Sequence, residues 1–213
     1  MKQPRQILPG IFAFPPNRDA LGGTAYLIVE NQGNILIDCP AWHQETQHFL
    51  RDRGPLRELV LTHRDGGRAG IAPLQAEFGC SVRVQEQEAY LLPECRVETF
   101  GAGDEITPDC QVIWTPGYSP GSSCVYLDRH GGILFSGRHL LPDQNGQLTL
   151  RRRPKTFHWW RQLASTAALR DRFSPETLYY LCPGANTGLL RGTGAIAAAG
   201  TALQQLDLSN LAG

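Results

Sequence analysis

The feature that most restricts how this 213-residue chain can fold is a repeated pairing of a short apolar run with a glycine- and proline-rich loop. Four loops follow such runs: THRDGGRAG at 62–70, TPGYSPGS at 115–122, FSGRHL at 135–140 and CPGANTG at 182–188. Glycine and proline set backbone angles that other residues adopt only at a cost, so loops of this kind hold a defined shape. We expect several strand ends that carry loops able to hold chemistry.

The spacing of apolar residues predicts two successive groups of strands, each followed by helices. Strands are expected at 10–14, 24–29, 34–38, 57–61, 81–85, 111–114, 123–128, 132–135 and 178–182, and a short hairpin is expected around 143–146. Helices are expected at about 42–54, 71–78, 157–173 and 195–206. This order predicts two sheets packed together with helices outside. Because no linker or repeat divides the chain, we expect residues 1–213 to form a single domain.

Composition restricts the location and the partners of the protein. Twenty basic and twenty acidic side chains cancel, so no overall field attracts nucleic acid or an anionic membrane. No segment approaches the roughly 20 apolar residues of a membrane span, and the N-terminal stretch MKQPRQILPGIFAF has no sustained apolar region. We therefore expect a soluble, cytoplasmic protein. Six scattered cysteines without a C-x-x-C pair predict buried thiols rather than disulfides or a zinc ribbon.

The four loops, together with the opening GGTAYLIV and GNILIDCP, resemble the metallo-β-lactamase superfamily over nearly the whole chain. That superfamily includes glyoxalase II and several RNA-processing hydrolases. The resemblance implies an α/β (α+β) fold, a four-layer αββα sandwich. It also implies strand-end loops that hold one or two metal ions, usually zinc, which activate water for hydrolysis.

The residues at the first metal-binding motif of that family are mostly different here. The family motif is T-H-x-H-x-D-H-x-G, and His63 is its one ligand that this chain keeps. Asp65, Gly67 and Arg68 stand at the positions of the second His, the Asp and the third His.

The other three motifs lack their ligands as well. Tyr118 replaces the His of T-P-G-H-T-P-G, Arg138 replaces the bridging Asp, and Ala185 replaces the His of P-G-H. The turn residues of these motifs are nevertheless retained: Thr62, Gly70, Pro116, Gly117, Pro120, Gly121, Gly137, Pro183 and Gly184. The pattern predicts that the fold is kept and that metal-dependent hydrolysis is lost.

The resemblance implies a degenerate pocket formed by six residues: His63, Asp65, Arg68, Tyr118, Arg138 and Asp38. A guanidinium stays protonated, and at about 4 Å it repels a divalent ion by several kcal/mol. We expect Arg68 and Arg138 to replace the metal charge, pairing with Asp65 and with Asp38, and we expect no metal or other cofactor. The forked donors of the two arginines can also hold an anion.

These observations predict a pseudoenzyme that acts by binding a protein partner or a small anionic ligand. The alternative is a divergent hydrolase of the esterase, thioesterase or phosphodiesterase type. It would use a single zinc or iron ion held by His63, Asp65 and Tyr118.

Two further motifs suggest other chemistry. The letters GYSPG fit G-x-S-x-G, but Pro120 after Ser119 has no N–H to donate and a strand follows, so we interpret the match as accidental. The basic run 151–155 predicts a solvated face, and nucleic acid is not an expected partner.

Tryptophans and histidines add two expectations. Trp160 shares helical spacing with Leu163, which predicts a core position, whereas Trp159 points elsewhere and would mark a contact patch if exposed. His139 follows Arg138 and is expected to point away from the pocket. The remaining histidines lack ligand spacing: His43, His48, His130 and His158.

Overall fold

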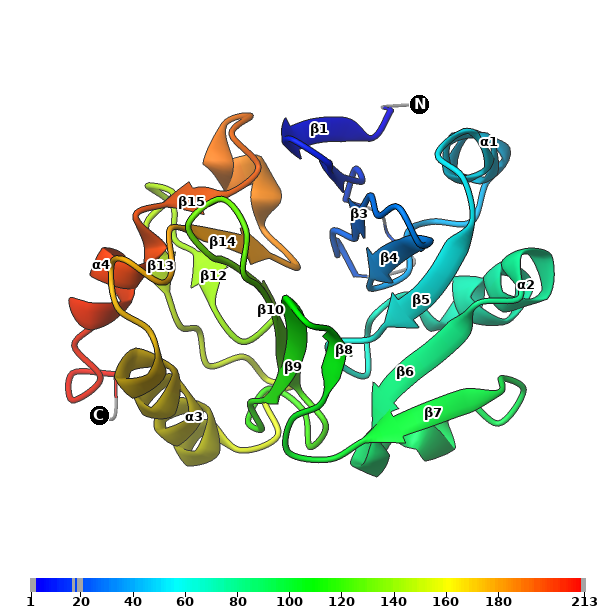
Figure 1. The fold of residues 1–213 in the computed structure, drawn as a ribbon. Coiled ribbons are helices and arrows are strands. Elements are labelled where there is room, and N and C mark those ends of the chain that lie inside the picture. The colour runs from blue at the N-terminus through cyan, green and yellow to red at the C-terminus, as the bar shows by residue number, and fades with distance from the viewer. Residues whose placement is uncertain (1–2, 17, 19–20, 212–213) are drawn as a thin grey trace. The chain divides into compact units, whose positions relative to one another are not determined.

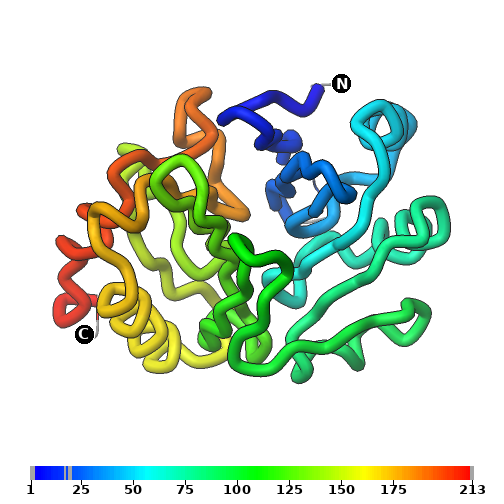
Figure 2. The backbone as a smooth tube through the Cα atoms, viewed as in Figure 1, coloured from blue at the N-terminus to red at the C-terminus, as the bar shows by residue number. Residues whose placement is uncertain are grey.

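The computed structural model describes residues 3–16, 18 and 21–211 (Figure 1). The extreme ends of the predicted domain, residues 1–2 and 212–213, lie outside the described residues. The chain divides into a first unit, Met1–Phe100, and a second unit, Gly101–Gly213. In Figure 2 the first unit runs from blue to green and the second from green to red.

The first unit contains one sheet in which the strands follow chain order. Its seven strands are β1 (Arg5–Leu8), β2 (Ile11–Ala13), β3 (Tyr26–Ile28), β4 (Asn34–Ile37), β5 (Leu56–Val60), β6 (Ser81–Gln85) and β7 (Val97–Phe100). Strands β1 to β4 pair antiparallel, and β4 to β7 pair parallel. The parallel strands are connected through α1 (Gln44–Asp52), α2 (Arg68–Phe78) and the 3₁₀ helix η1 (Glu86–Leu91), as parallel pairing requires a crossover.

Both helices of the first unit pack on the same side of this sheet (Figure 1). Leu50 of α1 and Ile71 and Leu74 of α2 are buried in one cluster with Leu36 of β4 and Leu59 of β5. The segment between β5 and α2 therefore runs between two packed elements, and this anchors the first loop at both ends.

The second unit contains a six-stranded sheet in the order β15-β14-β11-β10-β9-β8, and β12 pairs with β13 separately. Its strands are β8 (Glu105–Thr107), β9 (Cys110–Trp114), β10 (Ser123–Leu127), β11 (Ile133–Gly137), β12 (Leu141–Pro142), β13 (Leu148–Thr149), β14 (Tyr180–Pro183) and β15 (Ile196–Ala197). Its helices are α3 (Trp159–Arg172), the 3₁₀ helix η2 (Thr187–Leu190) and α4 (Ala199–Gln204). The hydrophobic core joins α3 and α4 to the sheet through Leu163, Leu169, Leu203, Leu134 and Leu181.

Nine predicted strands are present, with small shifts at their ends, and the differences have local causes. The predicted helix 195–206 is shorter, because Ile196 pairs with Leu181 as an edge strand and α4 begins only at Ala199. The predicted helix 71–78 begins earlier, at Arg68, directly after Gly67 in a left-handed conformation. Strands β12 and β13 pair antiparallel as the short hairpin expected around 143–146. Strands β1, β7, β8 and β15 were not predicted.

The prediction that Trp160 is a core residue is wrong. Trp160 is 60% exposed, whereas Trp159 is 9% exposed and its indole N–H donates to the carbonyl of Leu211 at 2.9 Å. The buried face of α3 includes Gln162 and Thr166, which are both fully buried. Because two of the buried side chains are polar, the spacing of apolar residues did not identify the buried face of α3. It assigned Trp160 to that face instead.

The cysteines and the hydropathy agree with the sequence predictions. All six cysteines, which lie in the described part of the chain, are free thiols, and five of them are buried. Burial raises the pKa of four of these thiols: Cys39, Cys80, Cys124 and Cys182. Across the described residues, no helix has the length and apolar character needed to cross a membrane.

Candidate functional site

The four loops lie at strand ends as predicted, and the candidate residues fall in both units. The first loop follows β5, and Asp38 follows β4. The second, third and fourth loops follow β9, β11 and β14. The first unit therefore supplies Asp38, His63, Asp65 and Arg68, and the second supplies the remaining two candidates, Tyr118 and Arg138.

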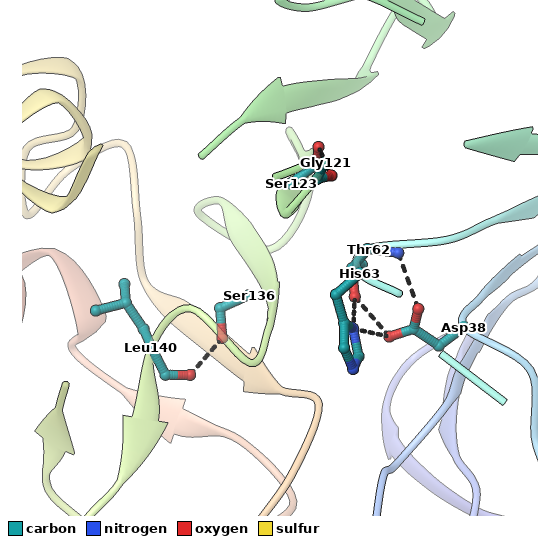
Figure 3. Close-up of polar contacts among 7 residues, drawn as sticks. All are labelled: Asp38, Thr62, His63, Gly121, Ser123, Ser136 and Leu140. Atoms are coloured by element: carbon teal, nitrogen blue, oxygen red, sulfur yellow. Dashed lines mark hydrogen bonds and ion pairs between the residues drawn. The ribbon is translucent and has the colours of Figure 1, made fainter. Parts of the chain in front are cut away.

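In the first unit, Asp38, Thr62 and His63 form a buried hydrogen-bonded cluster (Figure 3). The backbone N–H of Thr62 donates to Asp38 Oδ1 at 2.8 Å, and the Thr62 hydroxyl donates to Asp38 Oδ2 at 2.7 Å. His63 Nδ1 lies 2.8 Å from the Thr62 hydroxyl and 3.7 Å from Asp38 Oδ2. The carboxylate of Asp38 is thus directed at the Thr62–His63 pair.

The direction of these hydrogen bonds determines which nitrogen of His63 carries a proton. A hydroxyl has one proton, and that of Thr62 goes to the carboxylate, so Thr62 Oγ1 accepts from Nδ1–H of His63. In the neutral ring the lone pair then belongs to Nε2. Carboxylates and hydroxyls orient metal-binding imidazoles in this way. Asp38 and Thr62 therefore keep His63 in the orientation of a ligand or base.

The position where the family has its Asp cannot take a side chain with this backbone. Gly67 has φ 83°, and a Cβ atom there would overlap the carbonyl oxygen of Cys39. A Cβ atom at the neighbouring Gly66 would come within 2.6 Å of Asp38 Oδ1. The backbone of this loop therefore leaves no room for a side chain at either glycine.

Arg68 lies apart from the cluster around His63. It is the first residue of α2 and is exposed. It lines a surface pocket of about 330 Å³ together with Ala72, Leu91 and Cys95. No ion pair of Arg68 is found among the described residues.

In the second unit, Arg138 and Tyr118 lie together and are 4% and 2% exposed. The guanidinium carbon of Arg138 is 5.8 Å from the centre of the Tyr118 ring, within the range of a cation–π contact. Two hydrogen bonds hold the loop that carries Arg138. The Ser136 hydroxyl donates to the carbonyl oxygen of Leu140 at 2.7 Å (Figure 3), and the backbone N–H of His139 donates to the carbonyl oxygen of Ser136 at 2.9 Å. Arg138 is therefore a buried cation held on a rigid loop.

A second arginine, Arg153, belongs to this cluster and was missed by the sequence analysis. It is half-buried, and its guanidinium donates to Asn186 Oδ1 at 3.4 Å. Burial lowers the pKa of Arg153, the charges of Arg138 and Arg151 lower it further, and Tyr118 acts in the opposite direction. In the sequence, Arg153 is one of three adjacent arginines, and only its position in the 153–156 turn distinguishes it.

Ser119 is not placed as a nucleophile. It is fully buried in the tight turn from β9 to β10, where the backbone N–H groups of Gly117 and Ser122 both donate to its carbonyl. A nucleophile elbow leads from a strand into a helix and exposes its serine, whereas this loop joins two strands. The geometry supports the interpretation of GYSPG as an accidental match.

The side chains at the motif positions offer few groups that bind metal ions. In the described part of the chain, no group of three or more His, Cys, Asp or Glu side chains could hold a metal ion. Gly67 and Ala185 offer no donor atom on their side chains, and Arg138 is a buried cation at the position of the bridging carboxylate. No hydrolytic step through a two-metal centre follows from these residues.

Comparison with known proteins defines the fold. No protein-family model and no curated protein matches the sequence. Among solved structures, the DIM-1 metallo-β-lactamase matches with a TM-score of 0.69 and 17% identity, over 91% of this chain and 96% of its own. A metallo-β-lactamase with a HARLDQ motif from Cronobacter sakazakii matches with a TM-score of 0.67 and 17% identity, over 99% of this chain and 96% of its own. An archaeal metallo-β-lactamase superfamily protein from Sulfolobus tokodaii matches with a TM-score of 0.66 and 14% identity, over 96% of this chain and 86% of its own.

These similarities extend over both units, at identities that establish the fold alone. The strands and the four loops occur in the order that the sequence motifs predict. The chain therefore has the metallo-β-lactamase fold, in agreement with the predicted αββα class.

Proposed function

We propose that this metallo-β-lactamase-fold protein binds a small anion, such as a phosphate or carboxylate group, at Arg138 and Arg153, and that it has lost metal-dependent hydrolysis. The observation that carries the proposal is a pair of arginines in the second unit. Arg138 is buried against Tyr118, Arg153 is half-buried against Asn186, and the charge of Arg138 helps to lower the pKa of Arg153. The proposal replaces Arg68 of the expected arginine pair with Arg153, because Arg68 is exposed on α2.

The charge of Arg138 lowers the pKa of Arg153, and a bound anion would offset this repulsion between the two guanidinium groups. Forked donors suit carboxylate and phosphate oxygens. A hydrogen bond to a charged group contributes about 1.5–3 kcal/mol. Asn186 holds the side chain of Arg153 in position before binding, which lowers the entropy lost on association.

Loss of hydrolysis is supported by the residues that replace the ligands. The backbone at Gly67 excludes a carboxylate. Arg138 puts a permanent positive charge where the family has a bridging Asp. Each change disfavours a divalent ion for an independent physical reason.

The test is titration calorimetry of the purified protein with phosphate, sulfate and malonate. We expect saturable binding of at least one of them, weakened about tenfold or more by Arg153→Gln and by Arg138→Gln. Arg152→Gln is the matched control, because Arg152 is an exposed neighbour of Arg153. At 100 times Kd the anion should stabilise the fold by about 2.7 kcal/mol. Absence of binding by all three anions, or equal binding by wild type and both pocket variants, contradicts the proposal.

The second candidate is a hydrolase with one metal ion, and it is favoured by the orientation of His63. The Asp38–Thr62 pair leaves Nε2 as the lone-pair nitrogen of the neutral ring, and neutral imidazole is the form that binds a metal ion. In the first unit, the donors of this candidate are His63 and Asp65.

Metal analysis after purification without added metal tests this candidate. Near-stoichiometric zinc, iron or manganese that is removed by Asp65→Ala favours it over the pseudoenzyme. Esterase, thioesterase, lactonase and phosphodiesterase activity above background would have to disappear in the same variant. The anion proposal predicts background rates in every assay.

A further inference from the structure

We propose that α3 and the segment before it form a docking surface for an acidic, amphipathic segment of a partner protein. The docking surface consists of three parts: the exposed basic side chains of 151–161, the exposed rings of Phe157 and Trp160, and an apolar groove between α3 and β9. This inference is independent of the anion site.

The basic part is a local excess of charge on a chain whose net charge is zero. Residues 144–170 contain no Asp or Glu. Four cations of this segment are exposed: Arg151, Arg152, Lys155 and Arg161. Such a patch attracts an acidic partner and increases its association rate.

The two rings are exposed and yet held on a fixed backbone. Trp160 is 60% exposed and Phe157 is 50% exposed. The backbone N–H groups of Phe157 and His158 donate to the carbonyls of Tyr118 and Gly117 at 3.0 and 2.9 Å. Tryptophan and arginine are enriched among the residues that contribute most to protein interfaces, and fixed rings lose little entropy on binding.

The groove continues the same helical face beyond Trp160. It has a volume of about 380 Å³, and Ile113, Trp114, Ala164 and Ala168 are among its lining residues. Ala164 and Ala168 lie one and two turns after Trp160, and all three residues are exposed. Small side chains on the helix leave room for apolar side chains of a partner.

The three parts of the docking surface together select the chemistry of the occupant. The cations require acidic groups, and the groove with the rings requires apolar groups at the spacing of one or two helical turns. An amphipathic acidic helix offers both sets of groups at once. A nucleic acid satisfies the cations and can stack on the rings but has no aliphatic side chains for the groove.

The probe for the test is a synthetic helical peptide of about 18 residues, with Glu on one face and Leu and Phe at i, i+3, i+4 and i+7. Binding is followed by tryptophan fluorescence and by anisotropy of a label on the peptide. We expect saturable binding that weakens about tenfold in Trp160→Ala and in Ala168→Glu. Tyr90→Ala is the matched control, because Tyr90 is a 77% exposed ring outside the docking surface, and it should change binding by less than about twofold.

Three comparison probes make the result decisive: a scrambled peptide of the same composition, oligothymidylate, and vesicles containing phosphatidylserine. Weaker binding of all three than of the helical peptide supports the proposal. No saturable binding of the helical peptide, or equal or tighter binding of any comparison probe, overturns it. Arg153→Gln should leave peptide binding within about twofold, which separates failure here from failure of the anion proposal. Circular dichroism confirms that each variant is folded.

Discussion

Acid should destabilise this protein through His139, a fully buried histidine of the second unit. Its Nε2 lies 3.0 Å from the Thr166 hydroxyl, which itself donates to the carbonyl of Gln162, so the neutral ring donates from Nε2. Nδ1 is buried without a hydrogen-bond partner among the described residues. Burial lowers the pKa of His139 from 6.5 to about 3, because a charged imidazole would lose its hydration there.

The sign and the size of the effect follow from linkage. The unfolded chain takes up a proton below about pH 6.5, whereas folded His139 stays neutral down to about pH 3. The stability that this group contributes is complete above the unfolded pKa and is lost as the pH falls through this window. The slope reaches about 1.36 kcal/mol per pH unit, which gives a loss of about 2 kcal/mol between pH 7 and pH 5.

Urea unfolding at several pH values, followed by circular dichroism, measures this loss. His139→Gln should remove about 2 kcal/mol of the decrease between pH 7 and pH 5, whatever its effect at neutral pH. His48→Gln, at an exposed position on α1, is the control and should keep the wild-type decrease. If wild type and His139→Gln lose equal stability over this range, the neutral buried imidazole is refuted.

Three substitutions and one control, Gly188→Ala, test the loop geometry. Gly67→Asp should destabilise the fold by about 2 kcal/mol or more, measured by urea unfolding, and should not create metal binding, because a side chain there overlaps the backbone. Gly117→Ala should cost about 1–3 kcal/mol because its Cβ meets the backbone of α3, whereas Gly188→Ala faces open space and should change stability by less than about 0.5 kcal/mol. Asp38→Ala should cost about 3 kcal/mol in the same assay, since it leaves two donors of Thr62 unpaired.

Much of the fold could be predicted because its strands are apolar runs between turn residues. Strand β5 and the loop after it illustrate this, since a buried run ends where the glycine-rich motif begins. Strand β7 was missed because it lies at the edge of its sheet and exposes Glu98 and Thr99, so its sequence VETF shows no clear pattern. Such a strand depends on pairing with β6, which a local pattern does not contain.

The orientation of α3 could not be predicted for a related reason. Gln162 is fully buried, and its side-chain N–H donates to the carbonyl of His139 at 2.9 Å. Thr166 contacts the His139 ring. Both polar residues are buried because each has a hydrogen-bond partner more than twenty positions away in the sequence. A search for a periodic pattern of apolar residues does not count polar residues as part of the buried face. The exposure of Trp160 is the direct consequence.

The candidate site was predictable in its loops and unpredictable in its side-chain directions. The motif letters placed Arg68 and Arg138 near the ends of strands, but Arg68 begins α2 and is exposed, while Arg138 is buried. Arg153 lies outside every motif and is half-buried in a turn in which its backbone N–H donates to the Thr156 hydroxyl at 2.9 Å. A sequence motif indicates where a loop begins. The local backbone turn determines which of several adjacent arginine side chains is buried against another residue.

The packing of Gly67 also bears on whether the metal ligands of the family could be introduced into this chain. A carboxylate at this position needs a different backbone at the start of α2, because the glycine lies against the carbonyl of Cys39. Replacing Arg138 by Asp alone would remove a buried cation from beside Tyr118 and put a carboxylate in a desolvated place. Each ligand therefore depends on changes in its surroundings, and single substitutions should lower stability before they restore any metal binding. The proposed function therefore relies on the arginines that are present and not on a restored metal centre.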